Sequence, residues 1–187
     1  SDEVYSGLTY EGEYVSCGSF PEYQENVVVI QSCSKNFAMT GWRVGFVFAP
    51  ESIIKSLVSL QSQTITGTST VSQAVAVAVL AEAETINAAV RKQMKARRDL
   101  FVSEFNRLFQ QKISPPASAL YAFISLSVFG AQETNSEKFC QQILEKLNVV
   151  LVPGTAFGAE GYVRLSFGSP EAEIHEALKV LSNFDSD

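Results

Sequence analysis

The chain has 187 residues, of which 46% are hydrophobic and 18% charged, and its formal net charge is -6; this composition predicts a sizeable core in one or two domains and argues against a nucleic-acid partner. Three cysteines without metal-ligand spacing and a single histidine argue against a disulfide scaffold, a zinc site and a Ser-His-Asp triad. No apolar run is long enough to predict a membrane-spanning helix, and the composition is typical of a cytoplasmic α/β protein.

The first half of the chain predicts alternating strands and helices. Residues 26–31 and 44–49 are apolar runs rich in β-branched side chains, as expected for strands buried on both faces of a mainly parallel sheet. Pro50 and Glu51 then mark a helix start, because proline suits the first turn and the helix dipole favours a negative charge there. The predicted helices as far as residue 109 span 50–62, 71–82 and 85–109.

The second half of the chain predicts a smaller sheet with helices packed on it. The segment Ile113-Ser114-Pro115-Pro116 breaks the long helix, so we expect a domain boundary between residues 85 and 115. The elements expected after this break are strands at 119–127, near 149 and near 162, a helix at 136–147 capped by Ser136, and a final helix at 170–184. This order suits a small α+β domain.

A single lysine stands between two small hydroxyl residues in the segment 32–46, which reads Ser-Cys-Ser-Lys-Asn-Phe-Ala-Met-Thr-Gly-Trp-Arg-Val-Gly-Phe. A lysine that condenses with an aldehyde must first lose its proton, and burial and nearby positive charge favour that loss. Arg43 supplies the charge, and its forked donors also suit a phosphate group. Ser32 and Ser34 add hydroxyl donors, so Lys35 stands where a pyridoxal-phosphate enzyme requires its lysine.

This segment resembles the cofactor-lysine segment of the fold-type I, class I and II aminotransferases, the aspartate aminotransferase family. The resemblance implies that Lys35 forms the Schiff base with pyridoxal 5'-phosphate and then moves a proton between the substrate α-carbon and the cofactor. It implies that Ser32, Ser34 and Arg43 hold the phosphate group. It implies no metal ion.

Two further segments resemble the same family. Asp2-Glu3-Val4-Tyr5 is similar to the family's Asp-Glu-x-Tyr, which implies that Asp2 keeps the pyridine nitrogen of the cofactor protonated and that Tyr5 forms a hydrogen bond with its ring oxygen. The segment 149–158, with its Pro-Gly turn, and the following Val-Arg-Leu-Ser are similar to the family's small-domain strands. There the resemblance implies that Arg164 binds the substrate α-carboxylate, which a guanidinium on a rigid strand does in a bidentate pair.

The resemblance extends along the whole chain but covers only the C-terminal half of the family pattern. It implies an α/β fold in which residues 1–84 form part of the large domain, with a mainly parallel sheet, 85–112 form a bridging helix, and 113–187 form a complete small α+β domain. We therefore expect a fragment that is weakly active or inactive alone, and a homodimer in the full-length enzyme. One departure is Pro-Ala-Ser-Ala-Leu-Tyr at 116–121, where the family reads Pro-x-Gly-Ala-Phe-Tyr; we expect the lost glycine to alter the nearby backbone.

The reaction that the resemblance implies is transamination between an L-amino acid and a 2-oxo acid, with no nucleic-acid or membrane partner. Two alternatives stay open. A carbon–sulfur β-lyase on the same fold would use the same site residues, and product analysis (2-oxo acid against pyruvate with ammonia) would separate the two. A non-catalytic, aminotransferase-like sensing module is the other, and a DNA-binding domain encoded upstream would favour it.

Overall fold

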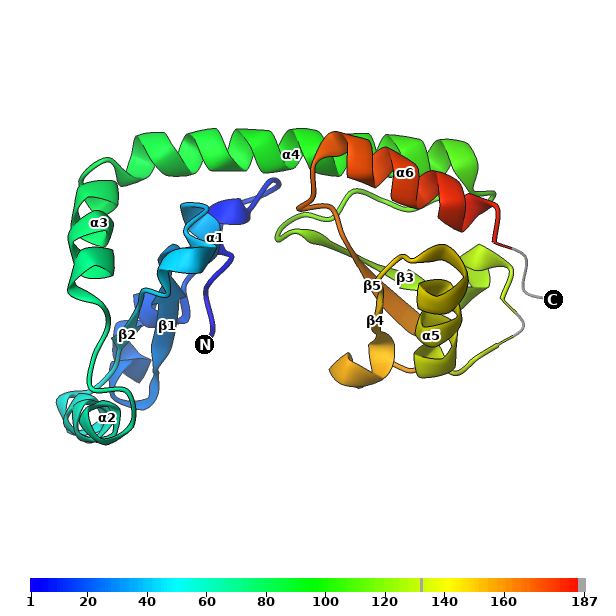
Figure 1. Cartoon of the computed structure of the whole chain (residues 1–187). Helices are drawn as coiled ribbons and strands as arrows, with labels where there is room; N and C mark the ends of the chain where they lie inside the picture. Colours follow the sequence, from blue (N-terminus) through cyan, green and yellow to red (C-terminus); the bar gives the residue numbers. More distant parts are fainter. Residues whose placement is uncertain (132, 185–187) are drawn as a thin grey trace. The chain divides into compact units, whose positions relative to one another are not determined.

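The computed structural model describes residues 1–131 and 133–184. It divides into two compact units, an N-terminal unit (Ser1–Gln93) and a C-terminal unit (Met94–Asp187). Figure 1 colours the N-terminal unit blue to green and the C-terminal unit green to red. The division falls within a long helix, α4 (Ala83–Leu108).

An antiparallel pair of strands, β1 (Val29–Ser32) and β2 (Gly45–Phe48), is central to the N-terminal unit. The mainly parallel sheet expected for these strands is therefore wrong. Within the described residues the parallel pairing is a single bridge, between Asp2 and Ile30. The pair is antiparallel because the connection 33–44 folds back on itself as compact turns instead of crossing over the sheet.

The two strands are also less buried than their sequences predict. Ile30 on β1 is 45% exposed, and Val47 and Phe48 on β2 are 40% and 59% exposed. A continuous apolar run predicts burial on both faces only when neighbouring layers cover both faces. Here the described residues leave much of this apolar surface open.

The longer helices of the N-terminal unit are α2 (Glu51–Thr64), α3 (Thr70–Ala81) and the first part of α4. Pro50 precedes α2 and Glu51 lies in its first turn, as predicted. The main buried apolar cluster is small and joins Cys33, Met39 and Val44 to Ala76 of α3. Helix α2 contributes no buried residue.

No single helix in the described part of the chain has the length and apolar character needed to cross a membrane. Helices α3 and α4 together reach that length and composition, but they meet at a bend of 89°.

The C-terminal unit contains a three-stranded antiparallel sheet with the strand order β3–β5–β4. Its elements are β3 (Tyr121–Ser125), β4 (Val152–Pro153), β5 (Tyr162–Ser166), α5 (Ser136–Leu147), α6 (Glu171–Ser182) and the end of α4. One face of the sheet buries Ala122, Ile124, Val163 and Leu165. Figure 1 shows α6 running along the end of α4 beside this sheet. The buried apolar side chains of the helices and of the sheet pack together and form an extensive core.

Helix α5 has the predicted bounds, but its cap is not the predicted one. The side chain of Asn135 accepts a hydrogen bond from the backbone N of Lys138 and so caps the helix. Ser136, expected to cap it, is fully buried in the first turn, and its Oγ accepts a hydrogen bond from Thr155 N. The sequence alone did not show which residue caps the helix, because serine and asparagine are both common at the N-cap position.

Candidate active site

The turn that carries the predicted lysine is the short helix α1 (Cys33–Asn36), which follows β1 directly. Ser32 caps it: its Oγ accepts a hydrogen bond from Ser34 N at 3.0 Å. The same Oγ lies 2.9 Å from Ser34 Oγ and 3.2 Å from the carbonyl oxygen of Val44. The structure therefore brings the two predicted hydroxyl groups together on one turn.

Lys35 is half-buried between Ser34 and Asn36, which are both buried. Within the described residues, no hydrogen bond or ion pair engages its amine. An unpaired amine held on a buried turn is chemically available to a ligand, whereas most surface lysines are fully solvated.

Arg43 stands where the chain turns back towards β2. Its backbone has φ 54°, in the left-handed region, and Nη1 donates a hydrogen bond to the Thr40 carbonyl at 2.8 Å. Ala38 has the same φ of 54°, so two non-glycine residues of this loop are strained, which is common at functional sites. The next residue, Val44, accepts a hydrogen bond from Cys33 N at 3.2 Å. This contact places the Arg43 backbone beside the Ser32 turn.

The last glycine of the lysine segment has a packing role. A Cβ on Gly45 would lie 2.7 Å from the Gln31 carbonyl oxygen, because β2 approaches β1 closely there. A Cβ on Gly41, in the same segment, would meet no atom within 4 Å. Gly45 therefore allows the strand pairing that closes the lysine loop.

Asp2 and Tyr5 lie in a segment that begins alongside β1. Glu3 N donates to the Ile30 carbonyl at 2.8 Å, and Ile30 N donates to the Ser1 carbonyl at 2.9 Å. This pairing is parallel, so the segment leaves β1 at the end where Ser32 and the lysine turn begin. Asp2 is exposed and its Oδ1 accepts a hydrogen bond from Val4 N at 3.1 Å. Tyr5 is half-buried just beyond it.

Glu3 is a site neighbour that the sequence did not reveal. The residue is 2% exposed, and its carboxylate accepts hydrogen bonds from Ser16 Oγ and Cys17 N at 2.9 Å and from Gln31 Nε2 at 3.1 Å. Burial, followed by the charge of Glu3, raises the pKa of the Tyr14 hydroxyl above its ordinary value. Glu3 thus fastens the loop after Asp2 to β1. The residues next to Glu3 in the sequence do not indicate these distant partners.

Asn36 is a second residue that the sequence did not single out. Its Oδ1 accepts a hydrogen bond from Gly7 N at 3.0 Å, and its Nδ2 donates to Ser6 Oγ at 3.1 Å. Its carbonyl accepts from Asn87 Nδ2 at 2.9 Å. A Cβ on Gly7 would collide with the Asn87 side chain. Asn36 therefore fixes the lysine turn against both the segment after Tyr5 and helix α4.

Arg164 lies on β5 in the C-terminal unit, opposite Phe123 of β3. Its guanidinium carbon lies 4.2 Å from the ring centroid of Tyr121 and 4.7 Å from that of Phe157. Leu165 and Val163 on either side of it are buried in the core, so Arg164 lies on the opposite face of the strand from its two apolar neighbours. In the same unit Ala119 has φ 64°, one residue after the serine that replaces the family's glycine.

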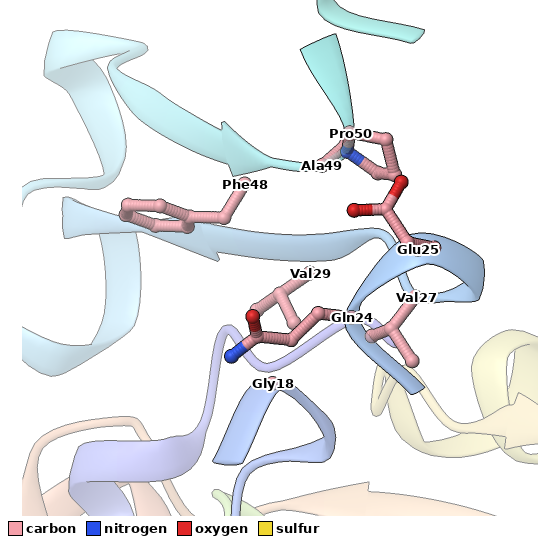
Figure 2. A pocket seen from close by; sticks show the side chains of 8 residues that line it. All are labelled: Gly18, Gln24, Glu25, Val27, Val29, Phe48, Ala49 and Pro50. Atoms are coloured by element: carbon pink, nitrogen blue, oxygen red, sulfur yellow. The ribbon is translucent and has the colours of Figure 1, made fainter. Parts of the chain in front are cut away.

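The hollows of the N-terminal unit differ in their relation to these residues. A pocket of about 290 Å³ between Gly18, Val29 and Pro50 contains one ionisable side chain, Glu25, and none of the predicted site residues (Figure 2). A cavity of about 440 Å³ borders the lysine turn and is lined by residues of mostly apolar character, Gln31, Ser32, Asn36, Phe37, Phe46, Phe48 and Leu80. In the described part of the chain, no three His, Cys, Asp or Glu side chains gather as metal ligands would.

The family model of aminotransferase class I and II matches residues 1–181. The chain is 36% identical to a bifunctional aspartate aminotransferase and glutamate/aspartate-prephenate aminotransferase of Petunia hybrida, over 96% of this chain and 40% of the relative. It is also 36% identical to an aspartate aminotransferase of Pyrococcus horikoshii, over 95% of this chain and 46% of the relative. The chain thus spans less than half the length of these curated relatives.

Solved structures resemble the whole chain as well. A double mutant of Thermus thermophilus aspartate aminotransferase matches with a TM-score of 0.84 and 31% identity, over 97% of this chain and 47% of that one. The aromatic aminotransferase of Pyrococcus horikoshii matches with a TM-score of 0.86 and 33% identity, over 97% and 49%. Both identities are high enough for the likeness to support common ancestry as well as a common α/β fold.

Proposed function

Because the chain belongs to the class I and II aminotransferase family, we propose that it is part of a pyridoxal-phosphate-dependent enzyme that transfers an amino group between an L-amino acid and a 2-oxo acid. The observation that carries this proposal is Lys35, whose amine has no hydrogen-bond or ion-pair partner among the described residues. It stands on the turn that holds the Ser32 and Ser34 hydroxyls 2.9 Å apart.

The residues of the N-terminal unit fit pyridoxal phosphate in their chemistry. Ser32 and Ser34 place two hydroxyl groups side by side, and the hydrogen bond from Ser32 to the Val44 carbonyl keeps the Arg43 segment beside them. These three residues would hold the phosphate group, Asp2 the pyridine nitrogen and Tyr5 the ring oxygen. When bound, pyridoxal phosphate supplies an electron sink for the bond that breaks at the substrate α-carbon.

Lys35 has two tasks in this proposal. Its Nζ would hold the cofactor covalently, and once a substrate amine occupied that place the free Nζ would accept the α-proton and later return a proton. Asn36 holds the turn through its bonds to Gly7 and Ser6, so the amine swings from a fixed backbone. Arg164 orients the amino acid by pairing with its α-carboxylate, which a forked guanidinium does with two parallel hydrogen bonds.

We further propose that the chain corresponds to the C-terminal half of the family fold. Residues 1–84 would be part of the large domain, 85–112 the bridging helix and 113–187 the small domain. The partial coverage of the relatives supports the idea that the chain is part of a larger fold, as does the exposed apolar surface of α2, where Val58 and Leu60 are each 60% exposed. The C-terminal placement itself comes from the resemblance of the lysine and Arg164 segments to the family pattern. Weak activity of the chain alone, a homodimer of the full-length enzyme and a cytoplasmic location remain predictions of the proposal.

Transamination is favoured over carbon–sulfur elimination by the names of the relatives. The plant protein is named for aspartate and prephenate transamination, and the Pyrococcus proteins for aspartate and aromatic transamination. The side-chain specificity of this chain is a separate matter, because its described residues include only part of the family fold.

Selective labelling of Lys35 tests the proposal. We expect that mixing the chain with pyridoxal phosphate, reducing with borohydride and mapping the peptides will place the label on Lys35, and that Lys35→Ala will remove it. Lys55→Ala is the matched control, because Lys55 is an exposed lysine paired with Glu51; this variant should leave the labelling of Lys35 unchanged. Label spread over the exposed lysines, with no preference for Lys35, would contradict the proposal.

A further inference from the structure

The arginines of the C-terminal unit differ in what they contact. Arg97 donates to the Gly168 carbonyl at 2.6 Å, Arg98 pairs with Asp99 at 2.7 Å, and Arg107 pairs with Glu104 at 2.7 Å. Arg164 is half-buried, yet within the described residues no hydrogen bond or ion pair reaches its guanidinium. It contacts two aromatic rings instead. A cation above an aromatic ring is attracted by the ring without a hydrogen bond to an acceptor, so these contacts leave the five N–H groups of the guanidinium for a ligand.

The two rings come from different elements. Tyr121 begins β3 and pairs with Ser166 of β5, two residues beyond Arg164. Phe157 ends the 3-10 turn Gly154–Phe157. A Cβ on Gly154 would collide with the Ala159 carbonyl oxygen, and Ala159 N donates to the Gly154 carbonyl at 2.9 Å. The glycine of the Pro-Gly motif thus lets the turn close and so determines where Phe157 lies.

The same turn is fastened to helix α5. Thr155 N donates to Ser136 Oγ at 3.4 Å, and Thr155 Oγ1 donates to Glu137 Oε1 at 3.1 Å. Ser136 is fully buried, so the turn has a rigid attachment. Phe157 also meets Phe123 edge-on, with ring centroids 5.8 Å apart. Phe157 is therefore held from several directions although the residue is 48% exposed.

We propose that Tyr121 and Phe157 are positioning residues for Arg164: their rings fix its guanidinium so that the N–H edge is ready for a carboxylate. This inference rests on the proposed role of Arg164 in binding the substrate carboxylate. A free arginine side chain loses much rotamer freedom on binding, and rings that restrict it beforehand reduce that loss. They also displace water from beside the guanidinium, which strengthens its attraction to a carboxylate.

The experiment follows the Arg164 side chain by NMR in the full ¹⁵N-labelled chain. The Nε–Hε signal of Arg164, identified by its loss in Arg164→Lys, should be shifted by the ring currents of both aromatics. Phe157→Leu and Tyr121→Leu should each move it towards the position of a free arginine and weaken binding of the probe, sodium succinate, about fivefold. Tyr121→Phe keeps the ring and should retain both properties. Circular dichroism confirms that each variant is folded.

Tyr162→Leu is the matched control, because Tyr162 is a 42% exposed aromatic residue on the same strand that stacks on Phe123 instead of Arg164. It should leave the Arg164 signal and succinate affinity unchanged. If the parent chain binds succinate at Arg164 and the leucine variants bind it equally well, only the positioning role is wrong. If succinate does not perturb the Arg164 signal of the parent chain at any concentration, the carboxylate role fails, and the positioning role fails with it.

Discussion

The two units have similar lengths but very different interiors. Among the described residues, six of the buried apolar side chains belong to the N-terminal unit and eighteen to the C-terminal unit. The large apolar side chains that remain exposed show the opposite distribution, with sixteen in the N-terminal unit and five in the C-terminal unit. The unit that carries Lys35 and its neighbours therefore has the weaker core, and the unit that carries Arg164 has the stronger one.

The difference has a local cause in each unit. In the C-terminal unit, Phe105 stacks on Phe109 with centroids 4.2 Å apart, and Phe129 meets both rings edge-on. Buried aromatic side chains each remove a large area from water. In the N-terminal unit, α2 has apolar residues but buries none of them. Burial of apolar area is the main favourable term in folding, so we expect the C-terminal unit to be the more stable.

Matched phenylalanine truncations should show the largest contrast. Phe139 is fully buried in the C-terminal unit, and Phe48 is 59% exposed in the N-terminal unit. We expect Phe139→Ala to lower the free energy of unfolding of its unit by about 3–5 kcal/mol and Phe48→Ala to change stability by less than about 1 kcal/mol. Urea unfolding followed by far-ultraviolet circular dichroism measures both. Equal losses would mean that the two interiors stabilise the chain equally.

Cysteine modification compares the two units within one unmutated chain. Cys17 is exposed, whereas Cys33 and Cys140 are buried in different units. Burial raises the pKa of the Cys33 thiol, and raises that of Cys140 to about 11. At pH 8 the Cys140 thiol is therefore ionised to only about one part in a thousand. Both buried thiols become accessible to a reagent when their unit opens. We expect iodoacetamide to modify Cys17 first, Cys33 next and Cys140 last.

Static burial alone predicts the opposite order for the two buried thiols, because Cys33 is 0% exposed and Cys140 is 9% exposed. Mass spectrometry of peptides taken at increasing times gives the order. Modification of Cys140 before Cys33 would contradict the lower stability of the N-terminal unit. In concentrated urea the three thiols should react at similar rates, which controls for intrinsic reactivity.

The sequence was most informative where a feature depends on near neighbours. The bounds of α5 and the start of α2 after Pro50 were predicted correctly, because caps, proline and helical periodicity act within one or two turns. The positions of β1 and β2 along the chain were also predicted approximately, but their antiparallel pairing was not. That pairing depends on how the connection 33–44 folds, and strand patterns alone do not encode it.

The predicted site residues show the same contrast between features set by near neighbours and features set by distant ones. Lys35, Ser32 and Ser34 were singled out because one short segment contains them, and the structure places the two hydroxyls together. Glu3 and Asn36 were missed because their partners lie 13 to 51 residues away. A single buried glutamate or asparagine has no distinctive pattern in the sequence. Such residues are found only when the distant donors and acceptors around them are known.

The smallest predicted effect concerns the backbone just before β3. Ala119 has φ 64°, a conformation that costs a residue with a Cβ about 1 kcal/mol or more. Glycine relieves this strain but gains freedom in the unfolded chain. We expect Ala119→Gly to raise the free energy of unfolding of the C-terminal unit by about 0.5 kcal/mol, measured as an increased urea midpoint with an unchanged slope.

Ser118→Gly separates this strain from the departure in the sequence, because it restores the glycine of the family pattern at a position that has no positive φ. Adding freedom to the unfolded chain without relieving strain should lower stability slightly. A larger gain from Ser118→Gly than from Ala119→Gly would mean that the serine is the strained residue. A gain in stability from Ala119→Gly and a small loss from Ser118→Gly would instead assign the strain to Ala119, two residues before Tyr121. In that case the replaced glycine and the left-handed residue are separate features of the segment that leads into the Arg164 site.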